Sequence, residues 1–324
     1  MMSSIGIRSL FCLLVFIGCM GKGYSQDLHV LKIKNVRQLH DFFKYRDDDR
    51  PIISGHRGGI VPGFPENSIE ALENTLKYTP AFFEIDPRLT KDSVIVLVHD
   101  ATLERTTNGS GKVIDYTWEE LQELRLKDHL GNVTPYKIPS LEETIKWSKG
   151  KTIINLDKKD VPLQMTAAII KKHKAYDHVM VTVHTAEQAR YFYNQDNRQM
   201  FSAFVRNMEE FKAFEEEGIP WSQIMAYVGP VSKPENKQLY DLLHERGVKV
   251  MISAAPSYDK LENTEERKAA YIKTIEEGAD VIESDLPIEV GAALQQQYKG
   301  DEPNAKYFGK QKARSNKSPT AGKK

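Results

Sequence analysis

Two carboxylates stand two positions apart in the apolar stretch FFEIDPRL, at Glu84 and Asp86. Side chains at positions i and i+2 of a strand point the same way, so both carboxylates face one side. Two carboxylates close together in an apolar setting resist ionisation, whereas a divalent cation that prefers oxygen ligands stabilises both. The pair therefore predicts a Ca²⁺ or Mg²⁺ site. Spacing alone leaves an ion pair with Arg57 or Arg88 as the alternative.

Two histidines follow other apolar runs. His56 and Arg57 come directly after the run PIISG, and His99 and Asp100 come directly after VIVLV. One histidine can take a proton from an attacking hydroxyl while the other protonates a leaving oxygen. Arg57 can hold a phosphate and offset its charge. A single histidine after a strand is more often structural, so the interpretation depends on the whole set.

The elements that position these residues follow from the pattern of the chain. Short apolar runs alternate with amphipathic stretches through residues 51–299, which predicts alternating strands and helices. Expected strands are 51–55, 81–89, 94–98, 151–156, 178–183, 201–205, 224–228, 248–252 and 280–283. Expected helices are 67–77, 163–173, 186–193, 208–217, 235–246, 264–278 and 286–298. About eight strand–helix units favour a (β/α)8 TIM barrel, with a doubly wound open sheet as the alternative.

Residues 105–141 break this alternation and predict an inserted subdomain over one end of the barrel, with one short helix at 118–126. Active sites of such barrels lie at the C-terminal ends of the strands, where the polar residues above are expected to fall. The run KTIINL adds another i, i+2 pair there, Asp157 and Lys159. Together these residues suit phosphoryl chemistry with a cation and an acid–base pair. The motifs of other hydrolase types, such as Gly-x-Ser-x-Gly, a Walker loop or His-Glu-x-x-His, do not occur.

The N-terminus has the layout of a secretory signal. Residues 1–25 contain Arg8, an apolar run over 9–20 that is too short to span a bilayer, and small residues before Gln26. We therefore expect an exported protein, periplasmic or extracellular, with no stable membrane span. Both cysteines lie in this segment, and lipid attachment at Cys19 is the alternative to cleavage before Gln26.

The segments on either side of the barrel and the overall composition contain no further candidate catalytic residues. Residues 26–50 are expected to lead into the barrel of residues 51–299, and residues 300–324 to form a basic, disordered tail. The formal net charge is zero, so no global charge favours nucleic acid as a partner.

Short motifs run in a fixed order through the chain. They are GHRG at 55–58, PENS at 65–68, FEID at 83–86, LTKD at 89–92, VHD at 98–100, LERTT at 103–107, IPSLEE at 138–143 and ESDLP at 283–287. In this order they resemble the glycerophosphodiester phosphodiesterase family over roughly residues 52–294. The resemblance implies a (β/α)8 barrel with a small insertion after the second strand. It also implies a small-molecule substrate, a glycerophosphodiester, which is split into glycerol 3-phosphate and an alcohol, with the neighbouring glycerol hydroxyl attacking first to give a cyclic intermediate.

The resemblance also implies roles for individual residues. The acid–base pair is His56 and His99, the ligands of the divalent cation include Glu84 and Asp86, and the residues around phosphate and metal are Arg57, Glu66 and Lys159.

Two positions depart from the family pattern. The family usually has Glu-x-Lys after the third strand, where this chain has Asp157-Lys158-Lys159. Asp157, the expected third metal ligand, is one methylene shorter, so either the metal shifts or a water bridges the gap. The family's seventh strand usually carries a Trp, whereas this chain has MISAAP at 251–256, which leaves open the substrate wall near Met251. Alternative functions are therefore a related phosphodiesterase acting on phosphoinositides or lysophospholipids, and a non-catalytic barrel that binds phosphorylated ligands.

Overall fold

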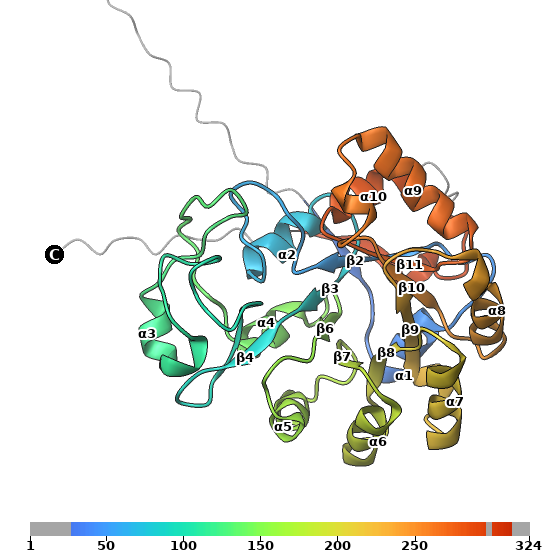
Figure 1. The fold of residues 1–324 in the computed structure, drawn as a ribbon, viewed down its shortest axis with the longest axis horizontal. Helices are drawn as coiled ribbons and strands as arrows, with labels where there is room; N and C mark the ends of the chain where they lie inside the picture. Colours follow the sequence, from blue (N-terminus) through green and yellow to red (C-terminus); the bar gives the residue numbers. More distant parts are fainter. Residues whose placement is uncertain (1–26, 296–299, 313–324) are drawn as a thin grey trace, which may run out of the picture.

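A closed barrel of parallel strands forms the centre of the protein (Figure 1). The computed structural model describes residues 27–295 and 300–312. Within them the barrel strands pair in the order β10-β11-β2-β3-β6-β7-β8-β9. Their bounds are β2 Ile52–His56, β3 Phe82–Ile85, β6 Ile154–Leu156, β7 Val179–Val183, β8 Met200–Phe204, β9 Ile224–Gly229, β10 Val250–Ser253 and β11 Val281–Ser284. The predicted (β/α)8 barrel is confirmed, and the open sheet is excluded because β10 and β11 join β9 to β2.

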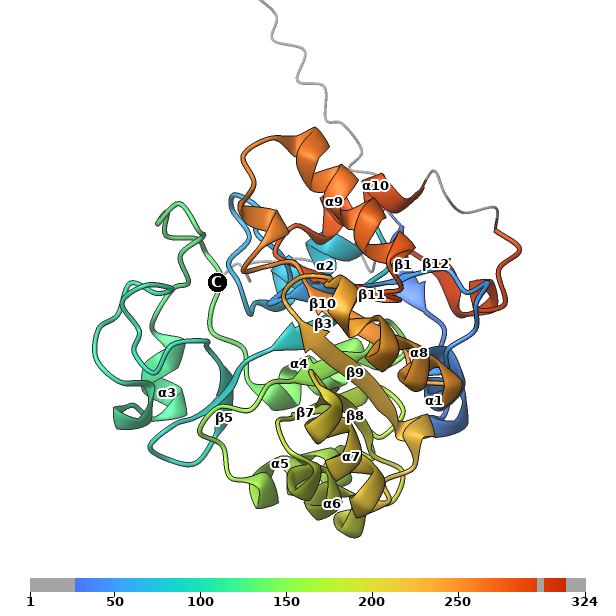
Figure 2. The same ribbon diagram turned by 45° about the vertical axis from the view of Figure 1, so that its right-hand side comes forward.

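A helix follows each barrel strand and covers the outside of the barrel (Figures 1 and 2). The helices are α2 Ile69–Leu76, α4 Leu141–Ser148, α5 Leu163–His173, α6 Ala186–Gln195, α7 Met208–Glu217, α8 Lys237–Glu245, α9 Thr264–Glu276 and α10 Pro287–Leu294. Polar caps fix where several of them begin. Ser140 and Glu143, for example, form a reciprocal capping box at the start of α4, where such a cap stabilises a helix by about 1 kcal/mol.

The predicted strand 81–89 is in fact two strands. After β3 the chain leaves the barrel at Asp86, and β4 Pro87–Leu89 pairs antiparallel with β5 Ile95–Leu97. Pro87 has no amide hydrogen and cannot extend the barrel ladder. The run 94–98 was therefore wrongly predicted as a barrel strand, and the insertion starts at Pro87 rather than at residue 105.

The insertion lies beside the barrel, next to α2 and α4 (Figures 1 and 2). It has an apolar core of its own, made of Val96, Val98, Leu103, Val113, Leu121, Leu126 and Ile138. Its one α-helix is α3 Trp118–Gln122, which begins at a capping box between Thr117 and Glu120. Because this core is separate from the barrel core, the insertion can hold side chains rigidly over one side of the barrel mouth.

Methionines close the bottom of the barrel. Met180, Met200, Met225 and Met251 come from four consecutive strands and are all buried. They pack in one cluster with residues of α1 Val36–Phe43. The substrate wall near Met251, which the sequence left open, does not include Met251 itself. Its side chain points into the barrel floor, and Ser253, two residues further along the same face, reaches the cavity at the mouth.

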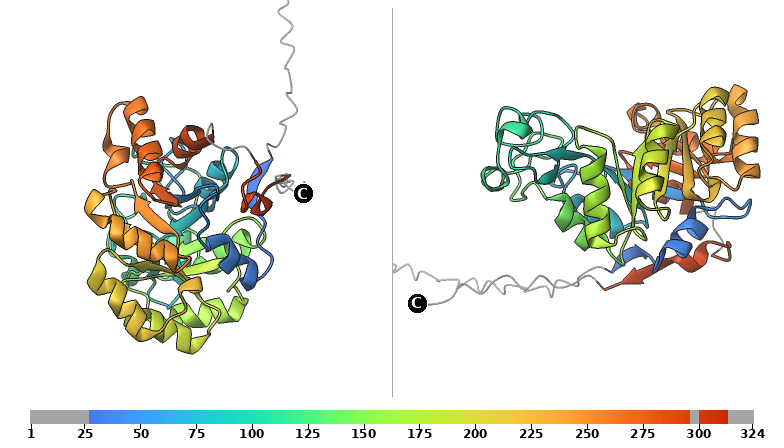
Figure 3. Two further views of the ribbon diagram at one scale, coloured as in Figure 1. Left: turned by 90° about the vertical axis from the view of Figure 1, so that its right-hand side faces the viewer. Right: turned by 90° about the horizontal axis from the view of Figure 1, so that it is seen from below.

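The two ends of the described chain pair with each other below the barrel (Figure 3). β1 Leu28–Leu31 and β12 Phe308–Gln311 form an antiparallel pair. The prediction of a disordered tail from residue 300 was wrong up to residue 312, because Tyr307 is buried and its ring packs against Phe42. The rest of the predicted tail and the predicted signal segment lie outside the described residues. Within the described residues, no helix has the length and apolar character needed to cross a membrane.

Candidate active site

Three carboxylates meet at the mouth of the barrel. Glu84 lies in β3, Asp86 directly follows it, and Asp157 directly follows the neighbouring strand β6. The Asp157 amide donates to the Ile85 carbonyl at 2.9 Å, which joins the two strand ends. One oxygen from each carboxylate lies within 4.8 Å of the other two. Oxygen ligands sit about 2.3–2.6 Å from Ca²⁺, so oxygens at this spacing can share one cation.

Glu84 is the most perturbed member of this acid cluster. Burial raises its pKa well above the usual range, and the charges of Asp86, Glu283 and Asp157 raise it further. Its Oε2 is buried and has no hydrogen-bond partner among the described residues. A buried carboxylate oxygen without a donor is unfavourable, and a cation is the partner that would satisfy it.

Asp86 and Asp157 are held by polar neighbours. Lys159 Nζ lies 3.0 Å from Asp86 Oδ1 and 2.6 Å from Asp157 Oδ2. The Asn67 amide group donates to Asp86 Oδ2 at 2.7 Å and accepts from the Asp86 backbone amide at 3.0 Å. Burial raises the pKa of Asp157, but the nearby His184, whose Nε2 lies 3.9 Å from Asp157 Oδ1, and the charge of Lys159 outweigh it and hold this pKa below the usual range. Asp157 is therefore ionised at neutral pH, as a metal ligand must be.

His56 is the last residue of β2, and the carboxylate of Asp285, which directly follows β11, orients it. His56 Nδ1 lies 2.7 Å from Asp285 Oδ1, and its Nε2 lies 3.7 Å from Glu84 Oε2. Burial lowers the pKa of His56, but the hydrogen bond with Asp285 and the charge of Glu283 raise it to a net value above the usual one. Asp285 is itself placed by Asp259, whose Oδ2 accepts from the Asp285 amide at 2.7 Å. The Asp285 contact at Nδ1 leaves Nε2 facing the acid cluster for proton transfer.

His99 has the same arrangement on the insertion side. It follows β5, and its Nδ1 lies 2.7 Å from Asp100 Oδ1. The Arg88 guanidinium donates to the His99 carbonyl, with Nε at 2.8 Å. Val98, the preceding residue, donates its amide to the Asp86 carbonyl at 3.0 Å, which ties this segment to the acid cluster. Each candidate catalytic histidine therefore has a carboxylate on Nδ1, although only His56 stands at the end of a barrel strand.

Arg57 lies in a strained part of the chain. Its φ is +55° and that of Asn67 is +59°, a left-handed conformation that is uncommon outside glycine. Such strain persists where surrounding contacts fix it, and it is frequent at functional sites. Here the Arg57 amide donates to the Glu84 carbonyl at 2.9 Å, and the Asn67 amide donates to the Arg57 carbonyl at 2.8 Å. The Arg57 guanidinium thereby bridges Asp86, at 3.2 Å, and Glu66, at 3.2 Å.

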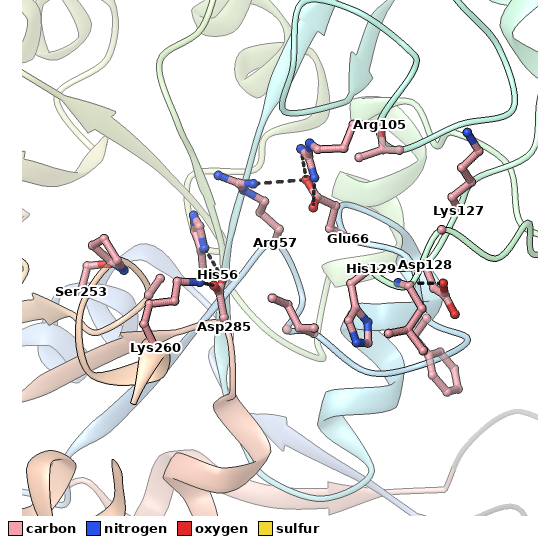
Figure 4. A pocket seen from close by; sticks show the side chains of 18 residues that line it. His56, Arg57, Glu66, Arg105, Lys127, Asp128, His129, Ser253, Lys260 and Asp285 are labelled. Atoms are coloured by element: carbon pink, nitrogen blue, oxygen red, sulfur yellow. Dashed lines mark hydrogen bonds and ion pairs between the residues drawn. The ribbon is translucent and has the colours of Figure 1, made fainter. Parts of the chain in front are cut away.

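A cavity of about 770 Å³ opens from His56 towards the insertion (Figure 4). The barrel side of its wall includes Ser253, Lys260 and Asp285, and the insertion side includes Arg105 and the segment 127–131. This volume is in the range of small-molecule sites.

The structure brings the predicted residues together in two groups. His56, Arg57 and Glu66 line the cavity. Glu84, Asp86 and Asp157 form the acid cluster, and Lys159 contacts two of these carboxylates. His99 connects to the cavity wall through Asp100, Arg105 and Glu66.

Three residues of the site were missed at the sequence level: Asn67, Arg105 and Asp285. Each lies inside one of the short motifs, which was the available signal. Arg105 binds Glu66 with both terminal nitrogens, at 2.6 and 2.8 Å, and also Asp100 at 2.6 Å, so it links the insertion to the barrel loop.

Comparison with known proteins decides the family. The sequence model described as the Glycerophosphoryl diester phosphodiesterase family matches residues 56–261. The chain belongs to this family. A crystal structure of a glycerophosphoryl diester phosphodiesterase from Parabacteroides distasonis is 56% identical, with a TM-score of 0.86, and the match covers 88% of this chain and 100% of that one.

Matches to curated members of the family are shorter. Glycerophosphodiester phosphodiesterase 1 of Bos taurus is 37% identical over 103 residues, which is 30% of each chain. Glycerophosphodiester phosphodiesterase of Caldanaerobacter subterraneus is 34% identical over 110 residues, 33% of this chain and 45% of that protein. The match thus spans less than half the length of these relatives. A phosphodiesterase structure from Oleispira antarctica shares the fold, with a TM-score of 0.58 and 19% identity over 76% of this chain and 97% of that one.

Proposed function

We propose that this protein hydrolyses glycerophosphodiesters to glycerol 3-phosphate and an alcohol, with the help of one divalent cation. The observation that carries the proposal is the pairing of two histidines, each with a carboxylate on Nδ1, with a three-carboxylate cluster and Arg57 at one barrel mouth. Family membership supports the same reaction. The Oleispira antarctica relative was solved with the product sn-glycerol-3-phosphate, which supports this product class here.

The acid cluster fits a hard divalent cation. Glu84, Asp86 and Asp157 would hold it, and both Ca²⁺ and Mg²⁺ prefer such oxygen ligands. The unpartnered, buried Oε2 of Glu84 supports this assignment. The shorter side chain of Asp157 reaches the cluster, which supports direct ligation rather than a bridging water. When bound, the cation would neutralise charge on the phosphate oxygens.

The side chains around the cluster supply the other functions. Arg57 offers hydrogen bonds and charge to the phosphate. In the first step, Nε2 of one histidine takes the proton of the attacking glycerol hydroxyl, and the other histidine gives a proton to the leaving alcohol oxygen. In the second step, with the two proton transfers reversed, a water molecule attacks the cyclic phosphate and opens it to glycerol 3-phosphate. Lys159 holds Asp86 and Asp157 in place and, with Glu66, positions charge around the phosphate.

The test is release of glycerol 3-phosphate from glycerophosphoethanolamine. His56→Ala and His99→Ala should each lower kcat by at least about 100-fold, in line with general acid–base contributions. Their thermal unfolding should stay close to that of the parent protein, because both histidines are partly exposed at the mouth. Turnover by both variants at the parental rate would contradict the proposed acid–base roles of the two histidines.

The alternative of a non-catalytic binder makes a different prediction: tight binding of glycerophosphodiesters by calorimetry, with no product. A related activity on phosphoinositides or lysophospholipids would show up as preferential turnover of those substrates.

We also propose export, on the basis of the predicted signal segment within residues 1–25 and the alternative lipid attachment at Cys19. The mass and N-terminus of the mature protein would distinguish cleavage before Gln26 from lipidation.

A further inference from the structure

The outer part of the cavity is bounded by a fixed loop of the insertion, residues 127–131. Asp128 holds this loop. Its Oδ1 accepts from the amides of Leu130 and Asn132, at 3.0 and 2.9 Å, and its Oδ2 accepts from the Gly63 amide at 2.9 Å. Gly63 belongs to the loop after β2, so the contact joins the two sides of the cavity. The side chains on this loop are therefore presented to a ligand in a defined arrangement.

The carboxylates in the cavity wall are engaged by other groups. Glu66 binds Arg57 and Arg105, while Asp285 binds His56 and Lys260. In the pairs with Arg105 and Lys260, the acids are also the less accessible members. Side-chain exposure is 48% for Arg105 against 19% for Glu66, and 61% for Lys260 against 12% for Asp285. A ligand entering the cavity therefore meets cationic donors rather than carboxylates.

Lys127 adds a positive charge on the insertion side. Its Nζ donates to the Glu104 carbonyl at 3.1 Å. Within residues 27–295 and 300–312, neither Lys127 nor the nearby His129 forms an ion pair with a carboxylate oxygen within 4.0 Å. Figure 4 shows both side chains across the cavity from Ser253 and Lys260. The third carboxylate of the wall, Asp128, is only 5% exposed and is used by the loop itself.

The cavity lacks the features that bind a quaternary ammonium group. Such groups are held by several aromatic faces, often with a carboxylate nearby. Among the described residues that line the cavity, Phe64 supplies the one aromatic hydrocarbon ring. Lys77 Nζ already lies 5.6 Å from the centroid of that ring, and Tyr136 stacks beside it at 6.4 Å.

We propose that this cavity selects glycerophosphodiesters whose leaving alcohol carries a negative charge, with Lys127 and His129 as the contacts for that charge. The inference rests on the proposed phosphodiesterase function and deepens it, because it concerns the alcohol rather than the scissile phosphate. The phosphate lies at Arg57 and the acid cluster. The leaving alcohol extends past Arg105 towards Lys127, which adds attraction for an anionic group and repulsion for a cationic one.

The experiment compares glycerophosphoserine with glycerophosphoethanolamine, which both carry an ammonium group and differ by one carboxylate, and uses glycerophosphocholine as the quaternary ammonium case. The expected kcat/KM for the serine diester is about tenfold above that for the ethanolamine diester, and the choline diester is the poorest substrate. Lys127→Ala should reduce the serine-to-ethanolamine ratio to about 2. The matched control is Lys137→Ala, which removes an exposed lysine of the same insertion that is not part of the cavity wall and should leave the ratio unchanged.

The outcomes separate this inference from the proposed function. Release of glycerol 3-phosphate from all three diesters at similar kcat/KM, or preference for choline, would overturn the head-group inference and leave the phosphodiesterase intact. An equal fall of the serine-to-ethanolamine ratio in Lys127→Ala and Lys137→Ala would also overturn the head-group inference, because the preference would then come from general surface charge. Absence of product from every diester would overturn the proposed function itself.

Discussion

Asp285→Asn removes the charge that orients His56 while keeping the shape of the side chain. The bond is short, 2.7 Å from Asp285 Oδ1 to His56 Nδ1, and the Asp285 side chain is 12% exposed. A hydrogen bond to a charged group at such a site contributes about 1.5–3 kcal/mol. If that energy orients His56 in the transition state, its loss corresponds to a fall in kcat of roughly 10- to 150-fold. KM should change little, because Asp285 does not lie at the expected phosphate position beside Arg57.

The assay is glycerol 3-phosphate release from glycerophosphoethanolamine over a range of concentrations, with thermal unfolding measured in parallel. The chain offers a matched control in Asp280→Asn. Asp280 binds His244 Nε2 at 2.9 Å with similar exposure, 14%, but it precedes β11 and lies at the opposite end of the barrel. Asp280→Asn should keep kcat within about twofold of the parent protein. A kcat above half the parental value in Asp285→Asn, or an equal loss in Asp280→Asn, would refute the reasoning.

Two predictions concern stability. Partial burial opposes ionisation of Asp41, but the hydrogen bond from Tyr307 and the charges of Lys306 and Arg46 lower its pKa to about 2. This depressed pKa stabilises the fold above about pH 4, and the stabilisation disappears as the pH falls through about 2. Asp41→Asn should therefore lower Tm at pH 7, and the Tm difference from the parent should shrink towards pH 2; a constant difference would contradict the linkage. Lys249 and Asp49 form a buried pair at 2.8 Å, with side chains 1% and 2% exposed, so Lys249→Ala should cost about 3–5 kcal/mol in chemical denaturation. A loss below about 1 kcal/mol would show that Asp49 does not stay charged.

The regular part of the fold was predictable because its periodicity is strong. The bounds of α5 and α7 match their predictions, since each amphipathic stretch packs one face on the barrel. The run at 94–98 was misassigned because an apolar strand packed on the insertion core has the same composition as a barrel strand. β1 and β12 are short, and each is stabilised by a partner about 280 residues away, so no local pattern marks them.

The site was predictable where residues of one element act together. Glu84 and Asp86 were found because their i, i+2 spacing is visible at the end of one apolar run. Asp285 was missed because a single Asp after a strand is unremarkable until barrel closure brings β11 beside β2. The substrate wall near Met251 stayed open because alternation along β10 shows which face a side chain occupies, but not whether it lies at the barrel floor or mouth.

The central claim, that Glu84, Asp86 and Asp157 hold a divalent cation required for phosphodiester hydrolysis, is tested most directly by chelation and restoration. Glycerol 3-phosphate release from glycerophosphoethanolamine would be measured before EDTA, after EDTA, and after adding Mg²⁺ or Ca²⁺, in the parent protein and in Asp86→Asn. We predict that EDTA abolishes release in the parent protein, that one of the two cations restores it, and that Asp86→Asn regains less than about 1% of the parental rate. Release that persists in EDTA, or full restoration in Asp86→Asn, would contradict the account.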